Sequence, residues 1–217
     1  MLLRSLFVIF FVISYSVTAN TDHSDAKTHS KQTTKILILG DSLSAGYGLK
    51  QDQAWAQLLQ NAYEQEKSPI LLINASISGE TSGGALQRLP ALLAEHSPDW
   101  VLVEIGGNDG LRGYPVKLLK QNLSQIVDKS IAADAKVLLM EIEITPNLGK
   151  RYATLFKGAY QQVANEKNVP LIPFFITSVV TDANLMLPDG IHPNAQAQPL
   201  LSEKMKQHFA DIILQSD

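Results

Sequence analysis

The 217-residue chain is 45% hydrophobic and 18% charged, which is ample for one domain with a buried core and marginal for two. A formal net charge of −3 offers no basic surface for nucleic acid or for an anionic membrane. The absence of cysteine excludes disulfides, a thiol nucleophile and a cysteine-linked lipid anchor.

The beginning of the chain has the pattern of a cleavable export signal. Arg4 supplies a positive charge, an apolar segment follows over residues 6–13, and Val17-Thr18-Ala19 places small residues before a cleavage point at Asn20. A membrane anchor is the alternative, but the apolar segment is shorter than the roughly 20 residues that span a bilayer. We therefore expect a signal peptide over residues 1–19, no stable membrane anchor, and a periplasmic or secreted protein.

A polar segment over residues 20–34 separates this signal from the rest of the chain. It contains no apolar residue larger than alanine, so it buries too little surface to offset the entropy of ordering. We predict a disordered tail, followed by a single domain over residues 35–217. His23 and His29 allow a metal site in the tail as an alternative, but a solvated linker is favoured and we expect no metal.

After the tail, short apolar segments alternate with segments of helical periodicity. The predicted strands are Lys35–Leu39, Ile70–Asn74, Trp100–Ile105, Lys136–Ile142 and Pro170–Ile172. The predicted helices are Ala54–Glu64, Thr81–Glu95 with a kink at Pro90, Pro115–Ala132, Tyr152–Asn168 and Ala195–Leu214. Near-continuous apolar strands between helices indicate a parallel sheet covered on both faces. The predicted fold class is α/β: three α/β/α layers around a flavodoxin-like five-stranded sheet in the order 2-1-3-4-5.

The first predicted strand ends in Gly40-Asp41-Ser42-Leu43, which places a hydroxyl group at the carboxyl edge of the sheet. Active sites of open α/β sheets gather at this edge. Glycine, aspartate and serine are also ordinary turn residues, so an ordinary turn remains the alternative for this motif considered alone.

A base and an orienting acid occur together in the loop Asp189-Gly190-Ile191-His192-Pro193, before the last predicted helix. Their spacing lets the Asp189 carboxylate reach Nδ1 of His192 while Nε2 faces a nucleophile. A loop that uses Asp and Pro only for turn geometry is the alternative. A serine hydroxyl needs such a base, since it is otherwise a weak nucleophile. Ser42, Asp189 and His192 are therefore the candidate catalytic residues.

A polar segment that contains Gly79 follows the second predicted strand, and a glycine-rich loop that contains Asn108 follows the third. Acyl transfer develops negative charge on a carbonyl oxygen, which fixed N–H groups stabilise. The backbone N–H groups of Ser42 and Gly79 and the Asn108 amide would supply three such donors. Loops that merely connect elements are the alternative.

The chain lacks three motifs that would indicate other kinds of site. It contains no Gly-x-Ser-x-Gly elbow, so the α/β-hydrolase arrangement does not apply. It contains no Gly-x-Gly-x-x-Gly fingerprint and no Walker loop, which counts against dinucleotide and nucleoside triphosphate sites.

These segments resemble, in order, the four sequence blocks of the SGNH (GDSL) hydrolase family. The blocks are Gly40-Asp41-Ser42-Leu43, Gly79, Gly107-Asn108-Asp109 and Asp189-x-x-His192. The resemblance extends over about residues 36–210. Within the family, the chain most resembles the bacterial periplasmic type that acts as thioesterase, arylesterase and lysophospholipase. The resemblance implies Ser42 as nucleophile, Asp189 as orienter and His192 as base, with Ser42, Gly79 and Asn108 as oxyanion donors. It also implies no cofactor and an acyl groove formed partly by residues 110–114.

We therefore expect a serine hydrolase that cleaves acyl esters or thioesters, such as aryl esters, acyl-CoA or lysophospholipids, through an acyl-enzyme. Asp41, Leu111 and Pro193 are the expected substrate contacts. The expected partner is a small acyl substrate rather than nucleic acid, and we expect a monomer. A carbohydrate O-acetylesterase is one alternative. A periplasmic flavodoxin-like module that binds a ligand without chemistry is the other.

Overall fold

The computed structural model describes residues 33–144 and 148–213. The predicted signal peptide, residues 20–32 of the predicted tail and Leu214 at the predicted end of the last helix lie outside these ranges. Within them, none of the helices combines the length and apolar character needed to cross a bilayer.

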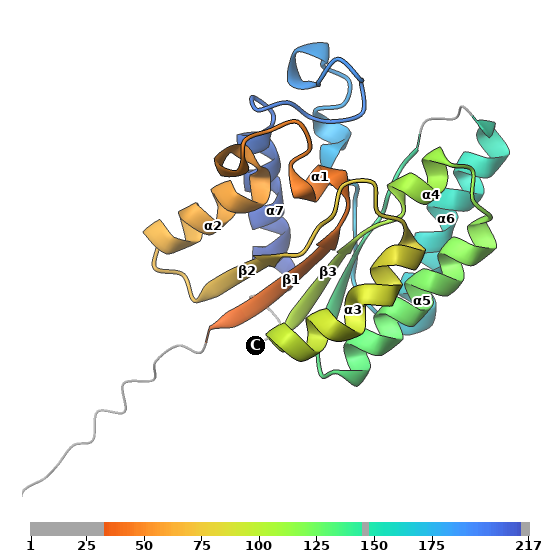
Figure 1. The fold of residues 1–217 in the computed structure, drawn as a ribbon, viewed down its shortest axis with the longest axis horizontal. Helices are drawn as coiled ribbons and strands as arrows, with labels where there is room; N and C mark the ends of the chain where they lie inside the picture. Colours follow the sequence, from red (N-terminus) through yellow and green to blue (C-terminus); the bar gives the residue numbers. More distant parts are fainter. Residues whose placement is uncertain (1–32, 145–147, 214–217) are drawn as a thin grey trace, which may run out of the picture. The chain divides into compact units, whose positions relative to one another are not determined.

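One parallel sheet in the order β2-β1-β3-β4-β5 forms the middle layer, which confirms the predicted order (Figure 1). Its strands are β1 (Thr34–Gly40), β2 (Ile70–Asn74), β3 (Trp100–Glu104), β4 (Lys136–Met140) and β5 (Leu171–Ile172). β1 begins one residue earlier than predicted because Thr34 pairs with Ile70 and its N–H donates to Pro69 O at 2.7 Å. The last residue of the predicted tail therefore belongs to the sheet.

Helices cover both faces of this sheet, as the apolar strands predicted. The longer ones are α2 (Trp55–Gln65), α3 (Ser82–His96), α5 (Val116–Ala132), α6 (Lys150–Lys167) and α7 (Gln198–Ile212), and short 3₁₀ helices occupy Gln51–Gln53, Phe175–Ser178 and Ala183–Leu185. α2 packs beside α7 in one layer, while α3, α5 and α6 form the other (Figure 1). α3 continues through Pro90.

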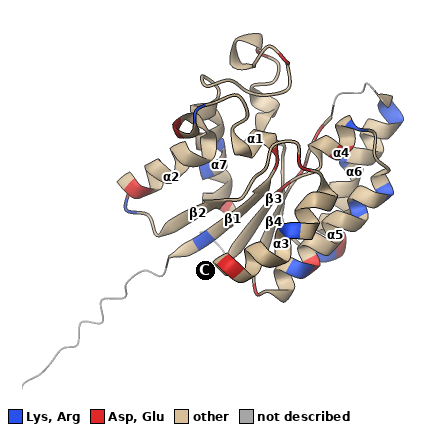
Figure 2. Cartoon of the chain, viewed as in Figure 1, with Lys and Arg blue, Asp and Glu red and all other residues tan. Residues whose placement is uncertain are grey.

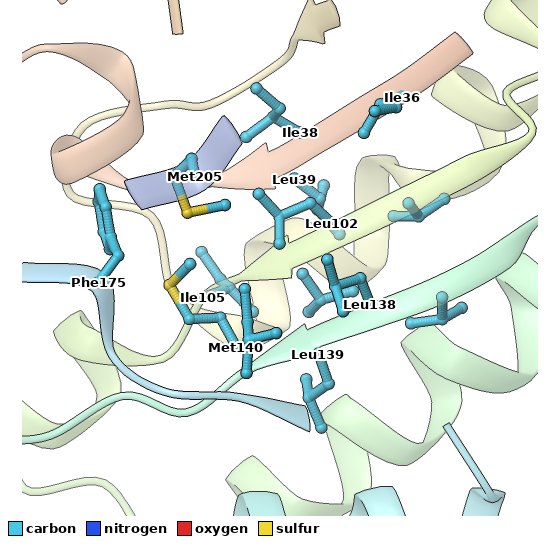
Figure 3. Close-up of a cluster of buried hydrophobic side chains, with 14 of the residues drawn as sticks. Ile36, Ile38, Leu39, Leu102, Ile105, Leu138, Leu139, Met140, Phe175 and Met205 are labelled. Carbon is cyan, nitrogen blue, oxygen red and sulfur yellow. The ribbon is translucent and has the colours of Figure 1, made fainter. Parts of the chain in front are cut away.

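The core lies where the three central strands run side by side. Ile38 of β1 pairs with Leu102 of β3, which in turn pairs with Leu138 of β4, and all three side chains are buried (Figure 3). Met205 of α7 and Phe175 belong to the same cluster. Lys, Arg, Asp and Glu lie mainly on the helices (Figure 2). The strands contain them only near their ends, at Lys35, Glu104 and Lys136. Burial on both faces explains why the central parts of these strands are apolar.

Two short helices that the sequence analysis did not predict begin at the carboxyl edge of the sheet. α1 (Ser42–Ala45) follows β1 where a turn was expected, and α4 (Gly107–Leu111) replaces the glycine-rich loop expected after β3. Gly106 turns the chain from β3 into α4 with φ of +124°, a conformation that favours glycine. Helices this short carry too few residues for periodicity to reveal them.

Replacing Gly106 by alanine should lower the free energy of unfolding by about 2 kcal/mol or more, because of its positive φ and because the new Cβ would collide with the Tyr160 hydroxyl. Gly158 is the matched control. It lies inside α6, and a Cβ there meets no atom within 4 Å, so Gly158→Ala should stabilise by about 0.5–1 kcal/mol. Urea unfolding measures the free energy of unfolding of both variants. Equal stability of Gly106→Ala and the wild type would contradict the expectation.

Candidate active site

Three residues from opposite ends of the domain meet at the carboxyl edge of the sheet. His192 Nε2 lies 2.8 Å from Ser42 Oγ, and His192 Nδ1 lies 2.8 Å from Asp189 Oδ2. Ser42 is the first residue of α1, directly after β1, and the other two lie in the loop before α7. The structure thus brings together the three residues that the sequence predicted as a catalytic group.

The Asp189 carboxylate is held in its ionised form. Desolvation raises its pKa, but hydrogen bonds from the N–H groups of His192 and Ile191, and from the His192 ring, outweigh this and lower the pKa to about 2. At neutral pH the carboxylate therefore accepts a hydrogen bond from Nδ1–H of His192. This interaction selects the tautomer in which Nε2 is free to accept the Ser42 proton.

The loop that carries Asp189 and His192 is tied to its surroundings by backbone pairing. Pro193 forms an antiparallel bridge with Met186, and Leu187 N–H donates to His192 O at 2.7 Å. The buried Gln198 amide donates to Pro193 O at 3.2 Å and accepts from Trp55 N–H at 3.0 Å. Pro193 is buried and does not line the cavity, so the expected substrate contact is corrected to a structural role in this loop.

Tyr47 covers one face of the His192 ring, a contact that the sequence analysis missed. The two ring centroids lie 4.5 Å apart with an interplanar angle of 38°, and Tyr47 is 51% exposed. Its N–H donates to Ser42 O at 3.1 Å, so the end of α1 determines where the ring lies. The aromatic ring therefore restricts the orientation of the imidazole while leaving its Nε2 beside Ser42.

Gly79 and Asn108 line the same cavity as Ser42, as their positions after β2 and β3 predicted. Ser42 opens α1, so its N–H has no acceptor in the preceding turn, and within the described ranges no backbone acceptor takes the N–H of Gly79. Arg112 at the end of α4 donates to Gly79 O at 3.1 Å and links the two loops. No sequence signal pointed to Arg112, because the contact joins residues 33 positions apart.

The residues adjoining Ser42 and Asn108 fasten these groups to the fold. Asp41 lines the cavity, but its Oδ1 accepts from Leu43 N–H at 3.1 Å and its Oδ2 accepts from Asn108 Nδ2 at 3.5 Å. Asp109 accepts two hydrogen bonds from Ser82, from the N–H at 2.7 Å and from the hydroxyl at 2.5 Å. The Asp41 carboxylate therefore fastens α1 and Asn108 at the wall of the cavity, and its predicted contact with the substrate stays a prediction.

Burial shifts the protonation of Asp41. Desolvation raises its pKa to about 6, against the lowering effects of the hydrogen bond from Leu43 N–H and of the nearby His192. The carboxylates of Asp109 and Glu80 add to the rise. Asp41 is consequently mostly ionised at neutral pH and becomes protonated as the pH falls below about 6.

A cavity of about 620 Å³ opens beside Ser42 and His192. Its walls are largely apolar, formed by Leu43, Leu111, Ile142, Ile144, Phe174, Ile176, Val180 and Ile191. Leu111 is thus placed as expected, on the segment 110–114 predicted to contribute to an acyl groove. Among the residues that the structure describes, no three His, Cys, Asp or Glu side chains cluster as metal ligands would, and the tail histidines lie outside those residues.

The chain is similar in sequence to a known family and to several of the known proteins. Residues 38–199 match the model of the GDSL-like lipase/acylhydrolase family. An arylesterase of Vibrio mimicus is 44% identical over 180 residues, which cover 83% of this chain and 90% of the relative. Thioesterase 1/protease 1/lysophospholipase L1 of Escherichia coli K12 is 47% identical over 178 residues, which cover 82% and 84% of the two chains.

Solved structures extend the likeness to three dimensions. The crystal structure of the psychrotrophic esterase EstA from Pseudoalteromonas sp., inhibited by monoethylphosphonate, is 50% identical with a TM-score of 0.82 and covers 83% of this chain and 98% of that one. Since the family model matches residues 38–199, well over half of the chain, the chain belongs to the GDSL-like lipase/acylhydrolase family.

Proposed function

We propose that this chain is a serine hydrolase that cleaves acyl esters and acyl thioesters through an acyl-enzyme formed on Ser42. The observation that carries the proposal is the pair of 2.8 Å contacts that joins Ser42 Oγ, the His192 ring and Asp189. The names of the relatives, arylesterase and thioesterase 1/lysophospholipase L1, support ester and thioester hydrolysis. A module that only binds a ligand would not need a serine hydrogen-bonded to an oriented base.

Acylation begins when His192 Nε2 removes the Ser42 proton as Oγ attacks the acyl carbonyl carbon. The resulting imidazolium is stabilised by the ionised Asp189. Negative charge passes to the carbonyl oxygen, where the N–H groups of Ser42 and Gly79 and the amide of Asn108 donate to it. His192 then protonates the leaving alcohol or thiol as its bond to the acyl carbon breaks.

Deacylation repeats the same steps with water as the nucleophile. His192 takes a proton from water, the hydroxide attacks the acyl-serine, and the same three donors stabilise the second oxyanion. His192 returns the proton to Ser42 Oγ as the carboxylic acid leaves. The cycle therefore requires only this chain's own side chains and a water molecule.

The shape of the cavity favours a substrate with a hydrocarbon acyl chain. Its volume of about 620 Å³ and its aliphatic and aromatic walls provide an apolar surface that an acetyl group would leave largely uncovered. Leu111 and Ile144 lie on this wall together with Phe174 and Val180. A carbohydrate O-acetylesterase, the alternative that the sequence left open, has no comparable use for such a wall.

Ser42→Ala should abolish both p-nitrophenyl ester hydrolysis and covalent labelling by a fluorophosphonate probe. Asn108→Ala should keep labelling but lower kcat by about 10²–10³, as other deletions of oxyanion donors do. Ser130→Ala is the control: its hydroxyl is fully buried and donates to Ile126 O in α5, near the start of β4, and activity should be unchanged. Undiminished hydrolysis by purified Ser42→Ala would refute the nucleophile assignment.

A series of p-nitrophenyl esters tests the acyl-chain proposal. We expect kcat/KM to rise from acetyl to octanoyl, by about tenfold for each 1.4 kcal/mol of free energy that burial of the longer chain contributes. Leu111→Ala should reduce the preference for octanoyl more than it reduces acetyl hydrolysis, because it removes part of the wall. A strong preference for acetyl in the wild type would favour the O-acetylesterase instead.

Export is the remaining part of the proposal. The signal-like pattern at the start of the chain supports transport to the periplasm or the medium, with cleavage before Asn20. N-terminal sequencing of the protein recovered from the periplasmic fraction should begin at Asn20. Recovery of the full-length chain from the cytoplasm or the membrane would contradict it.

A further inference from the structure

A carboxyl group that takes no part in the proposed chemistry contacts the residues on either side of the nucleophile. Glu104, the last residue of β3, is 0% exposed. Its Oε2 accepts a hydrogen bond from Ser44 Oγ at 2.7 Å and a longer one from Asp41 N–H at 3.4 Å. Within the described residues its Oε1 has no hydrogen-bond partner, and no lysine, arginine or histidine forms an ion pair with it.

The sheet brings this carboxyl group into place. Gly40 pairs with Glu104 across β1 and β3, two residues before Ser42. A Cβ on Gly40 would lie 2.7 Å from Glu104 Oε2 and 2.9 Å from Ser44 Cβ, so the carboxyl group fills space that only a glycine leaves open. The Gly-Asp-Ser motif and Glu104 therefore fit together as a single packed unit.

Both contacts of Glu104 are to the first turn of α1. Asp41 is the N-cap of this helix and Ser44 is its third residue, so the two hydrogen bonds hold the backbone on either side of Ser42. The Asp41 side chain is occupied by Leu43 N–H, which leaves the Ser42 N–H free as an oxyanion donor. A small rotation of α1 would move both Ser42 Oγ and that N–H.

We propose that Glu104 is a positioning residue for the nucleophile, which fixes α1 and with it Ser42 by accepting hydrogen bonds from Asp41 N–H and Ser44 Oγ. The proposal rests on the assignment of Ser42 as the nucleophile. Nothing in the sequence analysis pointed to Glu104, because an acid in an otherwise apolar strand shows its partners only after folding.

Burial favours the uncharged form of Glu104. Complete burial, followed by the nearby charge of Asp41, raises its pKa well above the usual value for a glutamate. The other titratable groups around it are Tyr160 from α6 and, beyond Asp41, Asp109 and His192. A neutral Glu104 adds no negative charge below the point where the oxyanion forms, whereas an ionised one would oppose that charge.

Substitutions that separate the hydrogen bonds from the charge test this role. Glu104→Ala should lower kcat by about 10- to 100-fold with little change in KM, because displacing the nucleophile affects the reacting geometry more than substrate binding. Glu104→Gln keeps an acceptor oxygen and should restore most of that loss. Equal losses in the Gln and Ala variants would overturn the proposal, as would a wild-type kcat in folded Glu104→Ala.

The Ser44 contact provides a second test that does not depend on Glu104→Ala folding. Ser44→Ala removes one of the two hydrogen bonds and should also lower kcat, while Ser130→Ala, with an equally buried hydroxyl, should not. Where Glu104→Ala folds, a double-mutant cycle of Ser44→Ala and Glu104→Ala should show non-additive effects on kcat, because Glu104→Ala has already removed the acceptor of the Ser44 hydroxyl. Independent, multiplying losses would overturn the proposal.

The pH dependence gives a readout that a purely structural role would not change. As the pH rises through the pKa of Glu104, the wild-type kcat should fall because the carboxyl group becomes charged, and Glu104→Gln should lack this fall while retaining Asp41, Asp109, Tyr160 and His192. Superimposable profiles would overturn the uncharged-acid role. Fluorophosphonate labelling distinguishes failure of the nucleophile assignment from failure of the role proposed for Glu104. Labelling of Ser42→Ala would refute Ser42 as the nucleophile. A wild-type labelling rate in Glu104→Ala would refute only the role of Glu104.

Discussion

The central position of β1 is the constraint on which the rest of the site depends. β1 lies between β2 and β3, so its carboxyl end, where Ser42 begins α1, is flanked by the loop that contains Gly79 and by α4, which contains Asn108. The chain then returns through the loop before α7, which delivers His192 to within 2.8 Å of Ser42 Oγ. A serine at the end of an edge strand would have neighbours on one side only, and the oxyanion donors could not surround it.

The site is built on buried acids that are not themselves proposed to react. Asp41, Glu104 and Asp109 are each at most 3% exposed, and their hydrogen bonds go to α1, Asn108 and Ser82. Burying a carboxyl group is costly, and the raised pKa values of Asp41 and Glu104 reflect that cost. The hydrogen bonds of these side chains hold the two short helices in a fixed orientation. Apolar packing alone would orient the helices less specifically, because it is not directional. Asp189 differs, because backbone N–H groups and the imidazole keep its pKa low.

Several expectations changed once the structure placed the residues. The glycine-rich loop after β3 is a short helix, and Pro193 supports its loop from within the protein instead of lining the cavity. Tyr47 and Arg112 were overlooked, although each contacts a residue that had been singled out. In each case the missing information was a contact between segments distant in sequence, or a helix too short to show a period.

The order and type of residues along the chain are enough to specify the architecture and the chemistry of the site. Apolar strands alternating with amphipathic helices specify a parallel sheet covered on both faces, and the residue types that end the strands indicate a nucleophile, a base, an acid and oxyanion donors. The folded arrangement was needed to show which polar groups support them, which walls form the cavity, and that, among the residues the structure describes, the buried Glu104 carboxyl accepts hydrogen bonds from Asp41 and Ser44 without forming an ion pair. The reason is physical: periodicity and motifs act along the chain, whereas the burial and pairing of a polar group depend on neighbours that folding brings from elsewhere.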